Sequence, residues 1–575
     1  MNADQLLALY EKVAEAPDAI SRLRRFVLDL AVRGKLVEQD PNDEPAAELL
    51  KRVGAEKASL VKAGVARKPR DISSLDQSDL PFSVPSGWVW TQLGQLGLVS
   101  PRNEAEDDLE ASFVPMPMIA AEYGVPNKHE VRSWGDIKKG YTHFAEGDVG
   151  LAKITPCFEN GKSTVFRGLT GGIGAGTTEL HVIRPILVEA DYIVTFLKSP
   201  QFIEIGIPRM TGTAGQKRVP ADYFAGSPFP LPPLAEQRRI VAKVEELMGL
   251  LDRVEAARQQ REATRDRLTV SSLARLTAAD AEPETFPTHA RFAIDTLPAL
   301  TTRPDQIKQL RQTILNLAVQ GRLEEQTPSD VPISEGLDQW LSEKLSGLTK
   351  GKRTKLLEAW RAVKSSPPNK LPPSWIWVTA EEICEEIVDC PHSTPKFAES
   401  GIACLDTNSV KSSGLLYEKL RFVSEETSAV RNKRLIPRPG DVVFAREGSV
   451  GETVIVPAGL KCCLGQRVML FRPSPVVSSE WFKLAISEPS ALRRLLTLHK
   501  GIGAKHVNVR DMRMSLQPLP PLAEQHRIVA KVDALMALCD QLEAALTTAE
   551  TSRTHLLDAL LHEALAETAP EREAA

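Results

Sequence analysis

Apolar residues recur at heptad spacing in two segments of the chain, and each segment follows a proline-rich stretch. The steps between these residues alternate between 4 and 3. This spacing places a narrow apolar stripe along a helix, and such a stripe is buried against another helix. Glu236 and Glu524, with the prolines ahead of them, are typical of a helix N-terminus. The stripe residues are Ile240, Val244, Leu247, Leu251 and Val254, followed by Ile528, Val532, Leu535, Cys539 and Leu542.

The stripes predict a central spacer helix over 231–275 and a C-terminal spacer helix over 519–565, which pair antiparallel like a coiled coil. A shorter amphipathic pattern, ending near Gly34 and again near Gly321, predicts helical regions over 1–75 and 305–363. An ordinary helical core without any spacing role is the alternative that the pattern leaves open.

The chain repeats itself. The eight residues PLPPLAEQ at Pro230–Gln237 recur at Pro518–Gln525, an offset of 288, and the similarity continues into RRIVAKVEELM and HRIVAKVDALM. LAVRGKL at Leu30–Leu36 returns as LAVQGRL at Leu317–Leu323. The stretches between these landmarks match only at scattered points. The chain is therefore a tandem duplication in which a shared frame, suited to two identical partners, carries two divergent inserts, suited to two different targets.

The inserts have the pattern of mixed α/β domains. Short apolar runs such as Val149–Ala152 and Val468–Phe471 lie between glycines, prolines and asparagines. We predict α/β (α+β) domains over 76–230 and 364–518, joined by the long helices with pseudo-two-fold symmetry. The segment 276–304, rich in Ala, Thr and Pro, is predicted to be a linker, and 566–575 a disordered tail.

Composition narrows the class of protein. Hydrophobic residues make up 42% of the 575 residues and charged residues 25%, which is typical of a soluble globular protein. The net charge of −4 excludes a uniformly basic nucleic-acid coat. The seven cysteines include no C-x-x-C pair, which favours reduced thiols in the cytosol. The N-terminus lacks a signal-peptide pattern, and no apolar stretch approaches the ~20 residues that span a bilayer. We predict a cytoplasmic protein without membrane association.

The catalytic motifs that the sequence resembles are each incomplete. Gly161-Lys162-Ser163 resembles the end of a phosphate-binding loop, but the glycine required five residues earlier is Pro156. The glycines of Gly168–Gly176 lack a strand-to-helix context, and the ten histidines lack metal-ligand spacing. We predict no catalytic residue, no metal site and no cofactor in this chain.

Basic residues gather near the end of each insert. The segment Arg493–Arg513 has a local charge of +5, and Lys198–Ala225 has +2. Each contains a small-residue turn followed by a cation, at Gly215-Gln216-Lys217 and at Gly503-Ala504-Lys505. Backbone N–H groups of such a turn can approach a phosphate, and the cation adds charge. Recurrence in both copies favours nucleic-acid binding over a solvated charged face, which remains the alternative.

Five motifs together resemble one protein family, the specificity (S) subunits of type I restriction-modification systems. They are LAVRGKLVEQDPNDEPAAELLKR from Leu30, LAKITPCFENGK from Leu151, TTELHVIRP from Thr177, GTAGQKRVP from Gly212 and PLPPLAEQRRIVAKVEELM from Pro230. The tandem layout covers nearly the whole chain.

The resemblance implies two target-recognition domains, each reading one half of a bipartite asymmetric site on double-stranded DNA. It also implies helices that set the spacing and dock two modification (methyltransferase) subunits. Those partners carry S-adenosylmethionine and methylate adenine, whereas restriction subunits use ATP and Mg²⁺ for translocation and cleavage in host defence. The S subunit itself is non-catalytic in this family.

The resemblance also supplies candidate DNA contacts. The second insert departs from the family pattern, because Arg446–Glu452 replaces TPCFENGK, so fewer residues are transferred there. A self-sufficient DNA-modifying enzyme and a purely protein-binding helical scaffold are the alternative functions. The candidate contacts are Lys153, Thr155, Asn160, Lys162, Gln216, Lys217 and Arg218 in the first insert, and Arg446, Lys505 and His506 in the second.

Overall fold

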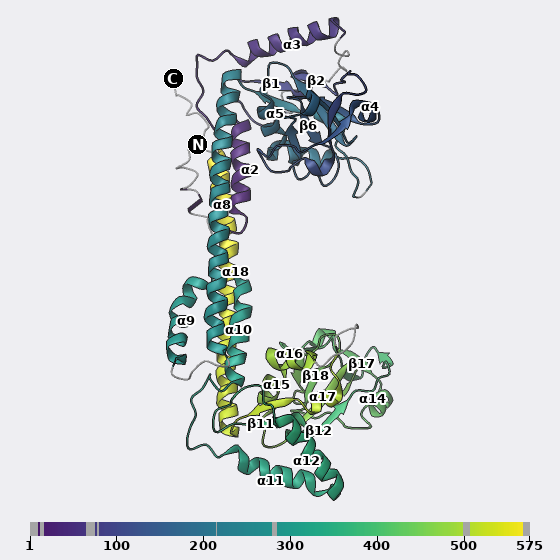
Figure 1. The fold of residues 1–575 in the computed structure, drawn as a ribbon, viewed down its shortest axis with the longest axis vertical. Helices are drawn as coiled ribbons and strands as arrows, with labels where there is room; N and C mark the ends of the chain where they lie inside the picture. The colour runs from purple at the N-terminus through teal and green to yellow at the C-terminus, as the bar shows by residue number, and fades with distance from the viewer. Residues whose placement is uncertain are drawn as a thin grey trace. The chain divides into compact units, whose positions relative to one another are not determined.

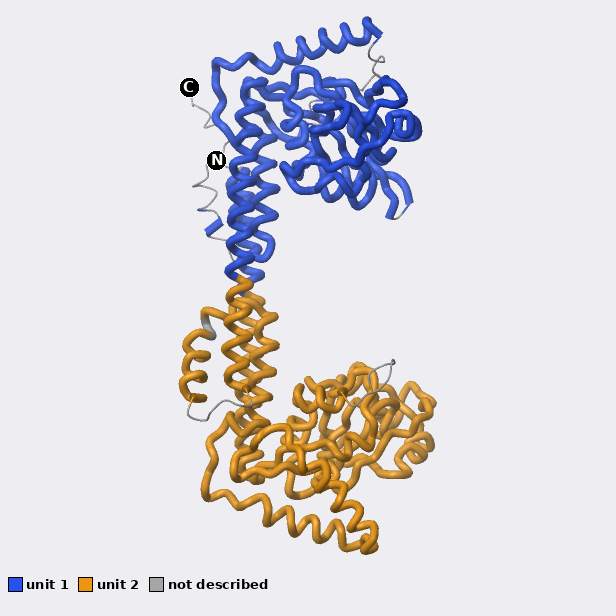
Figure 2. The backbone as a smooth tube through the Cα atoms, viewed as in Figure 1, with its two compact units in different colours: residues 1–261, 549–575 blue, residues 262–548 orange. Residues whose placement is uncertain are grey.

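The computed structural model describes residues 8, 10–11, 16–64, 75–76, 80–213, 215–278, 285–497 and 506–566. They form two compact units: unit 1 comprises residues 1–261 and 549–575, and unit 2 comprises residues 262–548 (Figure 2). Each unit contains helices of the repeated frame (α2 and α3 in unit 1, α10 and α11 in unit 2), a domain built on β-sheets, and part of each long helix (Figure 1). Residues 567–575 of the predicted disordered tail lie outside the described residues.

The long helices are α8 (Leu234–Thr277) and α18 (Leu522–Ala566). Helix α8 begins in unit 1 and ends in unit 2, whereas α18 begins in unit 2 and ends in unit 1. The five predicted stripe residues of α8 lie in the core of unit 1, together with α2 (Ala19–Val32) and the end of α18. The five of α18 lie in the core of unit 2 with α10 (Pro304–Val319). Each stripe is thus covered by a frame helix of its own unit.

The described residues of unit 1 form two four-stranded sheets and a two-stranded one. In the first, β2, β9, β6 and β7 lie side by side and all pair antiparallel; in the second the order is β4, β3, β8, β5, with β3 parallel to β8. Strands β1 and β10 pair antiparallel next to the start of α8. The bounds are β1 Val89–Gln92, β2 Gly97–Val99, β3 Glu110–Val114, β4 Glu130–Ser133, β5 Thr142–Ala145, β6 Val149–Ala152, β7 Ser163–Val165, β8 Ile173–Gly176, β9 Leu180–Pro185 and β10 Pro228–Leu231. The helices are α3 Ala46–Lys62, α4 Trp134–Ile137, α5 Ala190–Leu197, α6 Pro200–Gly206 and α7 Ala221–Gly226, with 3-10 turns η2 Leu93–Gln95, η3 Met116–Met118, η4 Thr170–Gly172 and η5 Ile207–Arg209.

Unit 2 repeats the first sheet strand for strand, in the order β12, β21, β18, β19, but its second sheet differs, with the order β13, β17, β14, β20. Strands β11 and β22 pair as β1 and β10 do. The bounds are β11 Ile376–Thr379, β12 Cys384–Asp389, β13 Phe397–Ala398, β14 Ile402–Leu405, β15 Val410–Lys411, β16 Gly414–Leu415, β17 Arg421–Val423, β18 Val442–Ala445, β19 Thr453–Ile455, β20 Cys462–Leu464, β21 Val468–Pro473 and β22 Leu516–Leu519. The helices are α9 Phe286–Leu300, α11 Ile333–Ser346, α12 Lys350–Lys364, α13 Ala380–Ile383, α14 Glu425–Arg431, α15 Ser479–Ser487, α16 Pro489–Thr497 and α17 Val509–Arg513, and the 3-10 turn η6 is Tyr417–Lys419.

The repeated motif PLPPLAEQ ties each domain to its long helix. The indole Nε1 of Trp88 donates to the carboxylate of Glu236 at 3.0 Å, and Trp375 donates to Glu524 at 3.0 Å. All four side chains are buried, and burial raises the pKa of both glutamates. A buried carboxylate is costly unless donors surround it. The structure therefore explains why this tryptophan and this glutamate recur together in both copies.

The glutamine that follows holds the same joint. Gln237 accepts a hydrogen bond from the backbone N–H of Glu189 at 2.9 Å and donates to the carbonyl of Pro232 at 2.9 Å. Gln525 makes the corresponding bonds, to the N–H of Ser478 at 2.8 Å and to the carbonyl of Pro520 at 2.9 Å. Each sheet domain is thus bonded directly to the first turn of a long helix.

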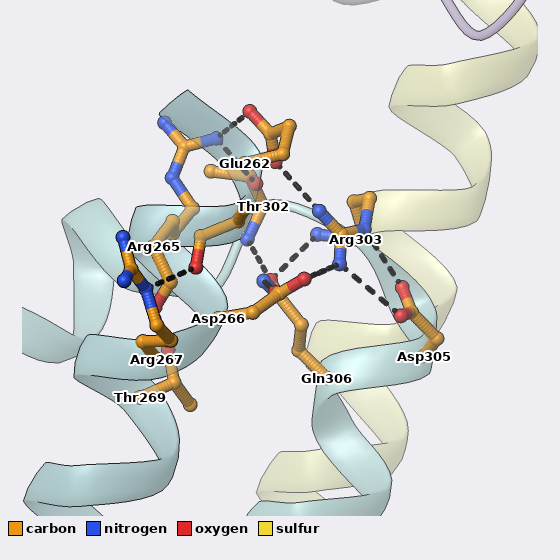
Figure 3. Close-up of polar contacts among 10 residues, drawn as sticks. Glu262, Arg265, Asp266, Arg267, Thr269, Thr302, Arg303, Asp305 and Gln306 are labelled. Carbon is orange, nitrogen blue, oxygen red and sulfur yellow. Dashed lines mark hydrogen bonds and ion pairs between the residues drawn. The ribbon is translucent and has the colours of Figure 1, made fainter. Parts of the chain in front are cut away.

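The middle of α8 is held by charge. Beyond Val254 the heptad stripe stops, and the helix is mostly polar as far as Arg267. In unit 2, Arg303 precedes α10 and pairs with Glu262 at 2.6 Å and with Asp266 at 2.8 Å (Figure 3). Gln306 on α10 donates to the same Asp266 at 2.9 Å. These bonds fasten α10 to the polar middle of α8.

The predicted linker 276–304 is not a simple linker, because it contains helix α9. Phe286, Ala290 and Ala293 are spaced 4 and 3 residues apart, and they pack against Leu273 and Leu317. The sequence did not predict this buried face because it contains alanines, and the alanine-rich composition was interpreted as a flexible linker. Alanine is, however, the strongest helix former.

The tryptophan–glutamate bond predicts a specific stability cost. Replacing Trp88 with Phe removes the indole donor and leaves a buried carboxylate short of a partner, so the free energy of unfolding should fall by about 1–3 kcal/mol. Trp90→Phe is the matched control, since Trp90 is only half-buried and contacts the ring of Phe82. Urea unfolding of the full chain measures both variants. Equal losses would show that ring volume, and not the hydrogen bond, matters.

Candidate nucleic-acid interface

Three loops of unit 1 meet at one end of its first sheet: residues 153–162 after β6, 177–179 before β9, and 211–219. Backbone bonds join them, from the N–H of Lys153 to the carbonyl of Glu179 at 2.9 Å and from the N–H of Val219 to the carbonyl of Lys153 at 2.8 Å. Thr155 binds the carbonyl of Lys217 through both its N–H and its Oγ1. The fold thus gathers residues that are more than 60 positions apart in the sequence.

Arg218 is oriented by an acidic neighbour. Its Nε and Nη2 donate to the two carboxylate oxygens of Glu179 at 2.8 and 2.9 Å, and its Nη1 donates to the carbonyl of Gln216 at 3.0 Å. The guanidinium lowers the pKa of the Glu179 carboxyl. Since the Arg218 side chain is still 42% exposed, it is fixed in direction without being buried.

The other predicted contacts of unit 1 differ in exposure. Gln216 and Lys217 are exposed at the tip of their loop, and Asn160 is exposed at the turn after β6. Lys162 is half-buried, and its Nζ lies 3.5 Å from the carbonyl of Met116. Lys217 is therefore the open cation of this loop, whereas Lys162 is partly used within the fold.

Unit 2 builds the same arrangement with different side chains. The N–H of Arg446 binds the carbonyl of Arg467 at 3.0 Å, and the N–H of Val507 binds the carbonyl of Arg446 at 2.8 Å. A backbone bridge joins Glu447 to His506, as another joins Ile154 to Arg218. These bonds make Arg446 the counterpart of Lys153, Arg467 that of Glu179, and His506 that of Arg218.

Arg446, a candidate DNA contact by the family resemblance, is mostly enclosed by the fold. Its Nε donates to Asp389 at 2.8 Å, and its side chain is only 11% exposed. This ion pair gives Arg446 a role in holding the loop. His506 is exposed, and Lys505 lies outside the described residues.

Glu179 and Arg467 were missed as candidate residues. The signal was available, because TTELHVIRP and GQRVMLFRP align at the offset of 288 that PLPPLAEQ defines. The insert before them differs in length by five residues between the copies, since Asp148 and Asp441 are 293 apart while Arg184 and Arg472 are 288 apart. That shift hides the correspondence of the loops until their hydrogen bonds are seen.

Comparison with known proteins places the chain in a family. Residues 391–549 match the model of the type I restriction modification DNA specificity domain. The specificity subunit of the type I restriction enzyme EcoAI of Escherichia coli is 36% identical, over 95% of this chain and 94% of its own. The corresponding EcoEI subunit is 38% identical, with the same coverage. The chain belongs to the type I restriction enzyme specificity subunits.

Solved structures extend the comparison. The HsdS subunit of Thermoanaerobacter tengcongensis is 23% identical to this specificity subunit, and the match covers 84% of this chain and 98% of that one with a TM-score of 0.44. A chain from a study of complex assembly and conformational transition of the type I R-M system matches with a TM-score of 0.47 and 22% identity, covering 84% of this chain and 99% of its own. The predicted family and fold class, two α/β domains joined by helices, are confirmed.

The described part of the specificity subunit contains neither a membrane-spanning helix nor a cluster of metal ligands. No helix there is both long enough and apolar enough to cross a membrane. Within the same residues, no group of three or more His, Cys, Asp or Glu side chains is arranged to hold a metal ion.

His181 is a titratable group in the candidate interface of the specificity subunit. It is buried, and its Nε2 donates to the carbonyl of Val219 at 2.9 Å, so it supports loop 211–219 from beneath. Burial lowers the pKa of His181 to about 4. The unfolded chain therefore binds this proton first as the pH falls below about 6.5, and stability is lost between there and pH 4.

We predict that lowering the pH from 6.5 to 5 removes about 2 kcal/mol of stability through His181, on the basis of its displaced pKa. The His181→Gln variant keeps a donor of similar reach and cannot titrate, so it should lose correspondingly less over this range. Thermal unfolding of both proteins at the two pH values measures the difference. The same loss in both would mean that another group titrates.

Proposed function

We propose that this specificity subunit is the DNA-recognition component of a type I restriction-modification complex and has no catalytic residue of its own. The domain of unit 1 reads one half of a bipartite, asymmetric site on double-stranded DNA, and the domain of unit 2 reads the other half. The observation that carries the proposal is the repeated arrangement of loops. The same backbone bonds present Lys153, Glu179 and Arg218 in one unit and Arg446, Arg467 and His506 in the other.

Physical chemistry supports this division of roles. Contacts to phosphates position a protein on DNA, whereas side chains at base edges select the sequence. A shared backbone scaffold with exchanged side chains suits the reading of two different half-sites. The exposed Lys217 suits a phosphate, because a lysine in the open acts as a mobile point charge.

The frame supports a proposal about partners. Arg239 pairs with Asp43 at 2.7 Å in unit 1, and Arg527 pairs with Asp330 at 2.7 Å in unit 2, both at the start of a long helix. A frame that is repeated in this way suits two copies of one modification subunit, and the long helices would set the gap between half-sites. S-adenosylmethionine, ATP and Mg²⁺ then belong to the modification and restriction subunits, and the complex acts in the cytoplasm on DNA.

Methylation mapping tests the proposed function. A host genome is read for methylated adenine with this chain and its neighbouring modification subunit present, and again with the chain deleted. We expect a bipartite motif that disappears with the chain, because the modification subunit alone lacks sequence recognition. A motif that persists without the chain would assign recognition to another protein, and the purified modification subunit serves as the control for methylation alone.

A second prediction concerns Lys217. Its replacement with Ala should weaken DNA binding alike on all sequences and reduce the slope of log affinity against log salt by about 1, as expected for one phosphate contact. Lys51→Ala on α3 is the matched control, since that lysine is exposed and paired with Glu48. Fluorescence titration at several salt concentrations measures both slopes. A slope equal to that of the control would remove Lys217 from the interface.

A further inference from the structure

One position of the repeated arrangement carries opposite charge in the two units. Glu179 immediately precedes β9, and its carbonyl accepts a hydrogen bond from the N–H of Lys153, which follows β6. In the same way Arg467 precedes β21, and its carbonyl accepts from the N–H of Arg446, which follows β18. Both units also share an Asp–Arg anchor, which is an ion pair between an arginine on the strand and an aspartate just before β6 or β18. Arg184 donates two hydrogen bonds of 2.8 Å to Asp148, and Arg472 donates two of 2.8 Å to Asp441. The two positions therefore correspond in the fold.

The charge at this position is used differently in the two units. In unit 1, Glu179 is engaged by Arg218, so the pair is neutral as a whole. In unit 2, the neighbouring Arg446 is neutralised by Asp389. Arg467 is exposed, and among the described residues no carboxylate lies within ion-pair distance of its guanidinium. Unit 2 thus presents an uncompensated guanidinium where unit 1 presents a closed ion pair.

The backbone at Arg467 adds a second observation. Its φ is +64°, in the left-handed region that a residue with a side chain adopts only at a cost. Glycine would occupy this conformation without strain, so the backbone alone does not call for arginine. The loop around it is held firmly, since Gln466 donates to the carbonyl of His392 at 3.0 Å. The guanidinium of Arg467 therefore projects from a backbone that is strained and held by hydrogen bonds.

We propose that Arg467 reads a guanine in the half-site bound by unit 2, and that the closed Glu179–Arg218 pair makes unit 1 select differently at the corresponding base pair. The inference rests on the proposed function. A free guanidinium offers two parallel donors that match O6 and N7 of guanine in the major groove. The guanidinium of Arg218 already spends two of its donor positions on Glu179, so it cannot offer the same fork.

Arg467→Gly is the decisive variant, because glycine removes the side chain and suits the left-handed backbone. Methylation is mapped in a host that carries the full complex. We expect preference for guanine at one position of one half-site to fall about 10- to 100-fold, with the other half-site unchanged. Arg467→Lys should retain part of the preference, since one donor remains. Arg434→Ala, at another exposed arginine of unit 2, is the control and should leave the motif intact.

Other outcomes overturn the inference. If Arg467→Gly lowers methylation evenly at every site and reduces the salt slope of binding, Arg467 contacts a phosphate. If the motif is unchanged, Arg467 lies away from DNA. In both cases the wild-type motif still depends on the chain, so the proposed function stands. If the wild-type chain directs no bipartite motif at all, the proposed function fails and takes this inference with it.

Discussion

A buried carboxylate at the start of each long helix is the constraint on which the rest of the molecule depends. Glu236 and Glu524 are buried, and burial raises the pKa of each. Each is tolerated because an indole N–H and a second glutamine, Gln39 for Glu236 and Gln326 for Glu524, donate hydrogen bonds to it. Removing one donor leaves the carboxylate without a substitute, since water does not reach it freely. The joint between domain and helix is therefore a place where few side chains are interchangeable, and the two copies of the chain keep the same ones.

This joint separates what must stay constant from what can change. The first sheet, its strand order and the Asp–Arg anchor are the same in both units, because each places buried polar groups that need matched partners. The loops beyond the anchor share their backbone bonds but differ in their side-chain bonds, which are Arg218 to Glu179 in unit 1 and Arg446 to Asp389 in unit 2. Recognition residues can therefore diverge at the loop ends while the support beneath them remains fixed.

The same separation explains what the sequence could reveal. Heptad spacing and a repeated motif predict α8, α18 and the duplicated layout, because apolar periodicity and local identity are visible along the chain. The burial of Arg446 was not visible, since its partner Asp389 lies on a strand 57 positions away. Glu179 and Arg467 were not predicted as site residues, because the five-residue length difference between the inserts hides that they occupy equivalent positions. Helix α9 was not predicted, because its buried face consists largely of alanines and gives no clear hydrophobic pattern.

Ion pairs at the interface favour discrimination over affinity. An arginine that is held by a carboxylate, as Arg218 is by Glu179, contributes little net charge toward the phosphates, so it adds little to sequence-independent binding. The carboxylate nevertheless fixes the guanidinium in direction, which reduces the side-chain entropy that a contact with a partner would cost. A chain with a net charge of −4 can thus read DNA without a broad basic surface. Strong attachment to DNA would then come from the few open cations and from the assembly that the two frames recruit.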